Sequence, residues 1–366
     1  MKIKLTAPPF TLPNASSYCS IPTYDGSGIL LHPDIIFFPT GFKGGLSDIY
    51  NYIMAYTPYP NSNNDYENPS IVVGKTPTQF TFDNISNPVV PPLPSGQFHS
   101  DSDIIYKDGT FYLYYRLCDE PVTYTKVYRR KSTDLISWSD AELCNIPLTG
   151  AEPVVSPAII FDGKWKMWCV NMEAGYQVAY LESDDGLNWT LIGYTDIPVA
   201  LTIGGGTRKI WHIDVNKTRL SGKYYGLFAY GTENGTPPYN APIYLIWAES
   251  DDGLNWTVYD QPVLSPSGVG WDSAVLYRST FFIYNRKVCV FYSGDNSPSG
   301  GTWHVGYTEA EVDFVNSEDA TLNVCGLPEA PTPEIVGLTE LIGGTLATLI
   351  LAEFLRKLHR ERRRKT

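Results

Sequence analysis

The chain has 366 residues and a formal net charge of −12, with 18% charged and 43% hydrophobic residues. This length and apolar content exclude an intrinsically disordered protein and leave room for one large domain or two. The acidic balance argues against nucleic acid as a partner, because a phosphate backbone binds basic surfaces.

The first 29 residues are predicted to form a segment outside the repeats that follow. They begin MKIKLTAPPFTLPNASS, which lacks the apolar run of a signal peptide, so we expect no signal peptide. The six cysteines of the chain show no metal-ligand spacing. Cys169 and Cys289 lie in apolar runs and are predicted to be buried free thiols, whereas the disulfide status of the chain stays open.

Strand-like runs then recur in five copies along the chain. The first reads HPDIIFF, YNYIMAYTPYP and NPSIVVG, and the second reads DSDIIYKDGTFYLYYR and TKVYRRKSTDLISW. The third reads VSPAIIF, FDGKWKMWCVN and GYQVAYLE, and the fourth reads WHIDV, GKYYGLFAY and PIYLIWAE. The fifth reads WDSAVLYRSTFFIYNRKVCVFYSG and TWHVGYTEAEV. Each copy therefore predicts two or three short β-strands, the first two joined by a hairpin.

A polar turn closes the third and fourth copies. LESDDGLNWT begins at Leu181 and AESDDGLNWT at Ala248, so nine of ten residues recur after 67 positions. Glycine at Gly186 and Gly253 permits the positive φ that such a turn requires. The tryptophans that end the turns are expected to pack beneath them: Trp138, Trp189 and Trp256. We therefore predict a structural role for this turn.

The five copies align on a short pattern in which a polar residue precedes two aliphatic ones. The polar positions are His32, Asp101, Ser156, His212 and Asp272, spaced by 69, 55, 56 and 60 residues. Repeats of this length, each forming one small antiparallel sheet, predict an all-β, five-bladed β-propeller over residues 30–320. The five residues should then surround one axial funnel, and residues 1–29 are a candidate for closing the ring.

These units resemble the five-bladed propeller glycosidases of glycoside hydrolase families 43 and 32. The resemblance rests on the opening pattern, the DGTFYLYY and DGKWKMW hairpins and the turn that ends in tryptophan, and it covers Leu30–Asp313. HPDIIFFPTGF, MAYTPYPNSNNDYENPSI, IWHIDV and WDSAVLYRST are similar to a divergent branch that also occurs in bacterial, archaeal and phage surface proteins.

The resemblance implies a base Asp opening the first blade, a pKa-tuning Asp opening the second and an acid Glu in the third. Here His32 and Ser156 depart from that pattern, and Asp101 fits it. Glu152 and Glu67 are the nearest acidic substitutes, although both could simply be hydrogen-bonding loop residues. Glycoside hydrolysis needs two carboxyl groups across the scissile bond, so the candidate catalytic residues are Asp101, Glu152, Asp214 and Asp272.

Aromatic and polar residues near the funnel are expected to bind sugar, because flat rings cover its apolar face and polar groups bind its hydroxyls. The candidate substrate-binding residues are His32, Asp34, Asp103, Arg116, Trp211, His212, Trp271 and Arg278. Tyr56 and Tyr59 are expected at the rim. No cofactor is expected, although the resemblance suggests an axial Ca²⁺ bound through His212.

Three functions remain open at this stage. The first is hydrolysis of a glycosidic bond in the axial pocket. The second is carbohydrate binding without turnover, for attachment at a cell or virion surface. The third is a structural spacer with no ligand. Carbohydrate is the expected partner in the first two.

The C-terminal part changes in character. Residues 321–334 are a Pro-rich linker, and residues 335–366 predict a hydrophobic helix with a basic tail. Ile335–Leu355 is about long enough to cross a membrane but includes Glu340 and Glu353. A membrane anchor at a cell or virion surface and an amphipathic helix that docks on a partner are both compatible with this pattern.

Overall fold

The computed structural model describes residues 2–4, 7–232, 242–298, 301–315, 317, 319–321 and 324–325. Residues 1–326 form one compact unit and residues 327–366 a second. The predicted helix over 335–366 therefore lies outside the described residues. Within the described ranges, no helix has the length and apolar character of a membrane span.

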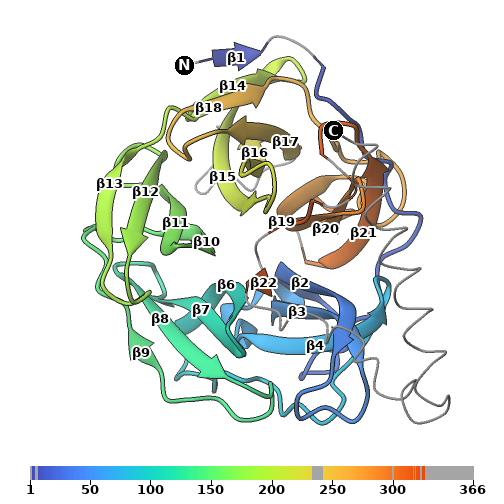
Figure 1. Ribbon diagram of the computed structural model, residues 1–366, viewed down its shortest axis with the longest axis vertical. Coiled ribbons are helices and arrows are strands. Elements are labelled where there is room, and N and C mark those ends of the chain that lie inside the picture. The colour runs from blue at the N-terminus through green and yellow to red at the C-terminus, as the bar shows by residue number, and fades with distance from the viewer. Residues whose placement is uncertain are drawn as a thin grey trace, which may run out of the picture. The chain divides into compact units, whose positions relative to one another are not determined.

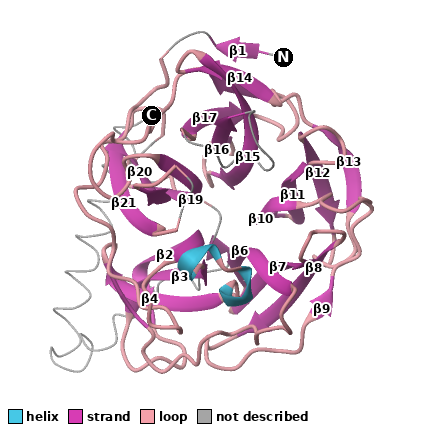
Figure 2. Cartoon of the chain, turned by 180° about the vertical axis from the view of Figure 1, so that it is seen from behind, coloured by secondary structure: helices cyan, strands magenta, loops and turns pink. Residues whose placement is uncertain are grey.

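Five antiparallel sheets surround one axis, which confirms the predicted five-bladed propeller (Figure 1), and Figure 2 shows the same five sheets from behind. Blade I contains β2 (Leu30–Phe42), β3 (Tyr50–Pro58), β4 (Ser70–Thr76) and β5 (Gln79–Thr81). Blade II contains β6 (Gln97–Lys107), β7 (Thr110–Asp119), β8 (Thr125–Ser132) and β9 (Glu142–Leu143). Blade III contains β10 (Val155–Asp162), β11 (Lys164–Asn171), β12 (Gln177–Ser183) and β13 (Thr190–Tyr194).

The last two blades differ in size from the first three. Blade IV contains β14 (Ala200–Ile203), β15 (Gly206–Lys217), β16 (Tyr224–Thr232), β17 (Tyr244–Ser250) and β18 (Trp256–Tyr259). Blade V contains β19 (Val275–Tyr284), β20 (Lys287–Asp295) and β21 (His304–Glu311). The strands β2, β6, β10, β15 and β19 contact one another in a closed ring around the axis. Because neighbouring blades cover both faces of these strands, they are buried along most of their length, and nine consecutive residues of β19 are buried.

Segments from both ends of the described chain join different blades. β1 (Lys2–Lys4) pairs in parallel with β18, and β22 (Val324–Cys325) pairs in parallel with β6. Between them, the Cys19 backbone N–H donates to Val305 O of blade V at 2.8 Å, and Ser20 N–H donates to Thr78 O of blade I at 2.8 Å. The N-terminal segment therefore bridges the last blade to the first.

The repeated turn connects neighbouring blades, in agreement with its predicted structural role. Asp252 accepts hydrogen bonds from the backbone of Leu254 and Asn255, and Gly253 has a φ of +78°. The Gly253 carbonyl accepts 2.9 and 2.8 Å hydrogen bonds from the indoles of Trp256, below the turn, and of Trp168, in blade III. The copy in blade III makes the corresponding contact with the preceding blade, because Tyr114 of blade II donates to the Gly186 carbonyl at 3.0 Å.

Each inner strand has a register irregularity near one end, and its position corrects the predicted alignment of the fifth copy. The irregularities lie between Leu31/Asp34, Ser100/Asp103, Val155/Ala158, Ile210/His212 and Leu276/Ser279. In blade V the bulge therefore holds Arg278. Asp272 precedes β19, where Ser267, Asn14 and Tyr292 donate hydrogen bonds to its carboxylate. The prediction of Asp272 as the fifth member of the ring was wrong, because the WDS segment is a loop.

Candidate functional site

The bulges bring His32, Asp101 and His212 together at the axis, together with Ser156. His32, Asp101 and Ser156 have φ values of +55°, +49° and +51°. This left-handed conformation is unfavourable for residues other than glycine, at about 1–3 kcal/mol each. Such strain is retained where the fold holds a side chain in one orientation. Here the bulges direct one side chain from each of three successive blades toward the same point.

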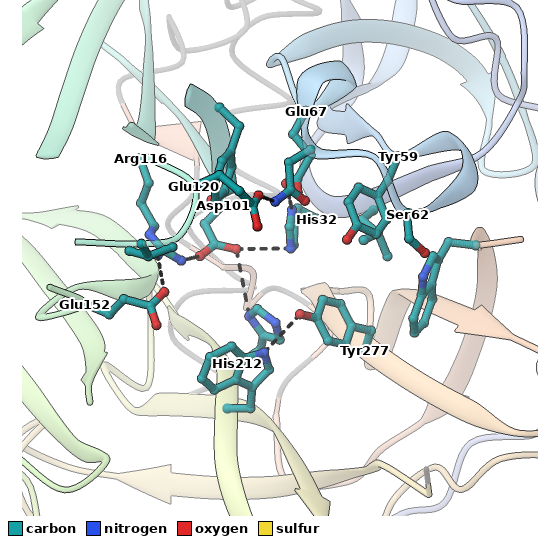
Figure 3. A pocket seen from close by; sticks show the side chains of 17 residues that line it. His32, Tyr59, Ser62, Glu67, Asp101, Arg116, Glu120, Glu152, His212 and Tyr277 are labelled. Carbon is teal, nitrogen blue, oxygen red and sulfur yellow. Dashed lines mark hydrogen bonds and ion pairs between the residues drawn. The ribbon is translucent and has the colours of Figure 1, made fainter. Parts of the chain in front are cut away.

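A cavity of about 340 Å³ lies on the axis above these residues (Figure 3). This volume is at the lower end of ligand pockets, which span about 300–1,000 Å³. The ionisable side chains that line it are His32, Glu67, Asp101, Arg116, Glu120, Glu152 and His212. The aromatic side chains that line it are Tyr59, Phe98, Trp211, Tyr277 and Trp303. A polar wall facing aromatic rings is the surface that a sugar ring requires.

Asp101 is the most heavily contacted carboxylate of the site. Its Oδ2 accepts hydrogen bonds from Arg116 Nη1 at 2.5 Å and from Ser156 N–H at 3.0 Å, and its Oδ1 lies 3.2 Å from His32 Nε2. Burial opposes ionisation, but His32 and Arg116 hold the pKa of Asp101 well below its usual value. Asp101 is therefore a permanent carboxylate at neutral pH.

The two histidines are buried and neutral. Burial lowers the pKa of His32 to about 4 and holds that of His212 well below its usual value. His32 Nδ1 faces Thr57 Oγ1 at 3.0 Å and Glu67 Oε2 at 3.5 Å, which leaves Nε2 directed at Asp101. Burial and the charge of Asp101 raise the pKa of Glu67 well above its usual range. The raised pKa makes Glu67 a carboxyl on the cavity wall that can both accept and release a proton.

His32, Asp101 and His212 could together hold a cation. One potential ligand atom from each lies within 4.8 Å of the others. Among the described residues, neither ring nitrogen of His212 has a hydrogen-bond partner, and Asp101 Oδ1 has only its ion-pair contacts. Unpartnered buried polar atoms cost about 1–3 kcal/mol each. Asp101 Oδ1 and the His212 ring thus keep unpartnered atoms beside His32, where a bound cation would satisfy them.

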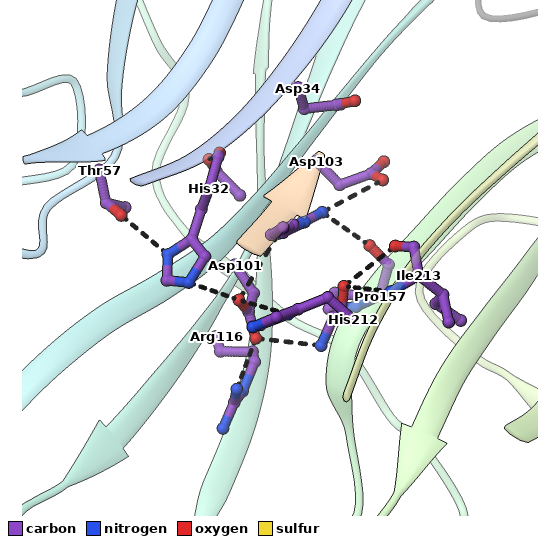
Figure 4. Close-up of polar contacts among 12 residues, drawn as sticks. His32, Asp34, Thr57, Asp101, Asp103, Arg116, Pro157, His212 and Ile213 are labelled. Carbon is purple, nitrogen blue, oxygen red and sulfur yellow. Dashed lines mark hydrogen bonds and ion pairs between the residues drawn. The ribbon is translucent and has the colours of Figure 1, made fainter. Parts of the chain in front are cut away.

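A second layer of carboxylates lies beneath the cavity, and Figure 4 shows two of its members, Asp34 and Asp103. Neither these two residues, predicted to bind substrate, nor Asp214, predicted to be catalytic, lines the cavity. Their positions therefore do not agree with the predicted roles. Asp34 and Asp103 accept hydrogen bonds from Ile104 N–H at 2.5 Å and Ile159 N–H at 3.2 Å. Asp214 accepts one from the backbone of blade V at 2.9 Å. Each carboxylate therefore ties its inner strand to another blade. Burial and nearby carboxylates raise the pKa of Asp214 to about 7.

The remaining predicted site residues separate into two groups. Glu152, Arg116, Trp211 and Tyr59 line the cavity as expected. The others do not line the cavity. Arg278 lies below it, and Trp271 packs on Tyr18 and Tyr292 outside it. Tyr56 is fully buried, and its hydroxyl donates to Pro22 O. Sequence reasoning missed Trp303 and Glu120, which follow no repeat position, and Tyr277, because the fifth copy was aligned on Asp272. It named Glu67 as an acidic substitute but did not include it among the catalytic residues. The YENPS loop was the one available signal, since it places Glu67 directly before a strand.

The similarities to known proteins agree with this fold. No family model matches the chain. It is 26% identical over 358 residues to the A-type blood N-acetyl-α-D-galactosamine deacetylase of Flavonifractor plautii. That match covers 83% of this chain but 44% of the enzyme, so the chain spans less than half of its length.

Solved structures show the same architecture. An N-acetylgalactosamine deacetylase from F. plautii, in complex with blood group B trisaccharide, superposes with a TM-score of 0.68 at 23% identity, over 82% of this chain and 95% of that one. A thermostable family-43 glycoside hydrolase gives 0.52 at 14% identity, over 84% and 98%. An exo-1,5-α-L-arabinanase from a bovine ruminal metagenomic library gives 0.53 at 12% identity, over 78% and 94%. The resemblance to the five-bladed propeller glycosidases is thus confirmed at the level of the fold.

Proposed function

We propose that the protein hydrolyses the acetamido group of an N-acetylated sugar residue bound in the axial cavity. The observation that carries this proposal is the buried set of His32, Asp101 and His212 at the cavity floor. One potential ligand atom of each lies within 4.8 Å of the others, and Asp101 and His212 keep unpartnered atoms. The similarity to a deacetylase that acts on an N-acetylated sugar supports the same reaction.

The donor set fits a transition-metal cation. Two neutral imidazoles and one carboxylate suit Zn²⁺ and related ions. Ca²⁺, suggested by the resemblance, takes six to eight oxygen ligands, and this set offers one carboxylate beside two nitrogens. A divalent cation bound by His32, Asp101 and His212 would polarise the amide carbonyl and make water more acidic.

Glu67 is suited to moving the proton in this reaction. It lines the cavity, and among the described residues its Oε2 has no hydrogen-bond partner beyond the 3.5 Å contact with His32. Water adds to the acetyl carbonyl carbon and the C–N bond breaks, so acetate and the free amine leave. In our proposal Glu67 accepts the proton of the attacking water and delivers it to the departing nitrogen.

The aromatic wall would hold the sugar ring. Trp211 Nε1 donates to the Tyr277 hydroxyl at 3.0 Å, and Tyr277 packs against Trp303 with their ring centroids 5.1 Å apart. This network fixes the rings of blades IV and V relative to each other. An apolar face of the sugar can stack there while its acetamido group faces His212, whose ring centroid lies 4.3 Å from that of Tyr277.

Hydrolysis of a glycosidic bond, the reaction predicted from the sequence, is a second candidate. Its carboxylates would be Asp101 and Glu152. However, Arg116 binds both of them, through Nη1 to Asp101 at 2.5 Å and through Nη2 to Glu152 at 3.1 Å. A guanidinium bound to both groups favours two carboxylates, whereas glycoside hydrolysis needs one of the pair as a carboxylic acid. The geometry therefore favours amide over glycosidic hydrolysis.

The deciding experiment follows the products of incubation with N-acetylhexosaminides and, separately, with aryl glycosides. We expect acetate and free amine in equal amounts, loss of activity after chelation and recovery with a divalent cation. His212→Ala should abolish turnover, and His304→Ala, a histidine outside the cavity, should not. Release of the aglycone without acetate would establish the glycosidase instead. Sugar binding without either product would leave a carbohydrate-binding protein.

A further inference from the structure

The carboxylate of Asp101 is contacted from every blade of the propeller. His32 of blade I and Arg116 of blade II lie 3.2 and 2.5 Å from it. Ser156 N–H of blade III donates to it at 3.0 Å, and His212 Nδ1 of blade IV lies 3.9 Å away. The contact from blade V is Arg278, whose Nη1 lies 3.7 Å from Asp101 Oδ1.

Arg278 is held from the other side by blades II and III. Its Nη2 donates to the Pro157 carbonyl at 3.2 Å and lies 3.9 Å from Asp103 Oδ2. The residue is 2% exposed, so the guanidinium is fixed between the cavity floor and the lower layer of carboxylates. Its planar fork can reach the Pro157 carbonyl and Asp101 at the same time, which a single ammonium cannot do.

The free end of this guanidinium faces the proposed cation site. Nη1 is buried and makes no hydrogen bond to any residue that the structure describes. A guanidinium only donates, so Nη1 cannot bind a cation and instead acts on the carboxylate beside it. Arg116 and Ser156 donate hydrogen bonds to Oδ2, and Arg278 makes a longer ion-pair contact with Oδ1, so donor groups face both oxygens of the carboxylate.

We propose that Arg278 is a positioning residue, which holds Asp101 Oδ1 where it meets His32 and His212 and thereby sets the cation affinity of the site. This inference rests on the proposed function, because it presupposes the cation site. Arg278 would act on that site through the orientation of Asp101. Groups that orient a metal ligand from behind typically change metal affinity by about 10–100-fold. The alternative is that Arg278 only neutralises Asp34, Asp103 and Asp214 beneath it.

Arg278→Lys separates these two roles, because lysine keeps the charge and loses the fork. Zn²⁺ binding to the full-length protein would be measured by calorimetry, after subtracting the binding that survives in His212→Ala. We expect Arg278→Lys to weaken axial binding by about 10–100-fold. Arg129→Lys, another buried arginine, pairs with Glu142 away from the cavity and should match wild type. With cation saturating, Arg278→Lys should lower kcat for deacetylation and leave KM unchanged.

Wild-type Zn²⁺ affinity in Arg278→Lys would overturn the proposal and assign Arg278 to charge balance. A Tm lowered by more than about 10 °C in this variant would also overturn it, because the arginine would then be structural. A wild-type protein that binds no Zn²⁺ at the axis would exclude this role too. If wild type binds Zn²⁺, Arg278→Lys binds it weakly and neither deacetylates, the proposed function fails and the positioning role stands.

Discussion

Gly253→Ala tests whether the repeated turn holds neighbouring blades together. A Cβ at this position would lie 2.7 Å from Cζ2 of Trp168, a fully buried ring of blade III. The ring cannot move away freely, because its indole N–H donates to the Gly253 carbonyl at 2.8 Å. Alanine at a φ of +78° costs about 1–2 kcal/mol. Displacing a packed ring costs about 1–3 kcal/mol more, so we expect a loss of about 2–5 kcal/mol in unfolding free energy.

Gly163→Ala is the matched control for the backbone cost. Gly163 has a φ of +70°, and no described atom lies within 4 Å of the position of its Cβ. Gly163→Ala should therefore lower the unfolding free energy only by the backbone cost of about 1–2 kcal/mol. Urea unfolding of both variants, followed by tryptophan fluorescence and circular dichroism, gives the difference between them. Equal losses would refute the reasoning, since they would show that the contact between the turn and Trp168 adds nothing to stability.

Two further predictions concern acid stability and catalysis. Although burial raises it, hydrogen bonds from Asn255 and Leu254 lower the pKa of Asp252 to about 2. Its contribution to stability is therefore present above the unfolded pKa of about 4 and is lost as the pH falls from about 4 to 2. Asp252→Asn should flatten the decline of the urea midpoint in this range, and Asp251→Asn, one residue away, should leave it steep. Glu67→Gln should keep axial Zn²⁺ binding and lower kcat for deacetylation by at least about 100-fold. A variant that loses both would show that Glu67 serves mainly to orient His32.

The blade repeat was readable from the sequence because each copy is a complete local unit. The turn needs Gly at positive φ, an Asp that caps two backbone N–H groups and a Trp beneath, so all three recur at fixed spacing in blades III and IV. The ring positions of the first four blades were readable for the same reason, since a polar residue stands at the same place before a mostly aliphatic pair in each. In these four copies, the position of a residue in the repeat therefore predicts its position in the folded blade.

The fifth position was misread because a similar pattern occurs in a loop. Asp272 precedes aliphatic residues as Asp101 does, but the strand begins only at Val275. The residue that reaches the axis is Arg278, in the bulge between Leu276 and Ser279. A bulge depends on pairing with the neighbouring strand, so its position is set by tertiary contacts that the fifth copy alone does not encode. The loop residue Glu120 was missed for a related reason, since it follows no period, and Glu67 was named only as an acidic substitute.

The departures from the glycosidase pattern explain how one propeller could serve a different reaction. At the third blade Ser156 replaces an acid, and its Oγ is fully buried in hydrogen bonds with the Ile213 carbonyl, at 3.0 Å, and N–H, at 3.1 Å. It therefore cannot protonate a leaving group. At the first blade His32 replaces a base, and its Nε2 faces Asp101 as a second nitrogen donor beside His212. In our proposal, serine and imidazole at these two positions replace an acid–base pair with a set that would bind a cation from the same bulges. The reaction is then decided by which side chains the bulges carry, and the fold decides only where they meet.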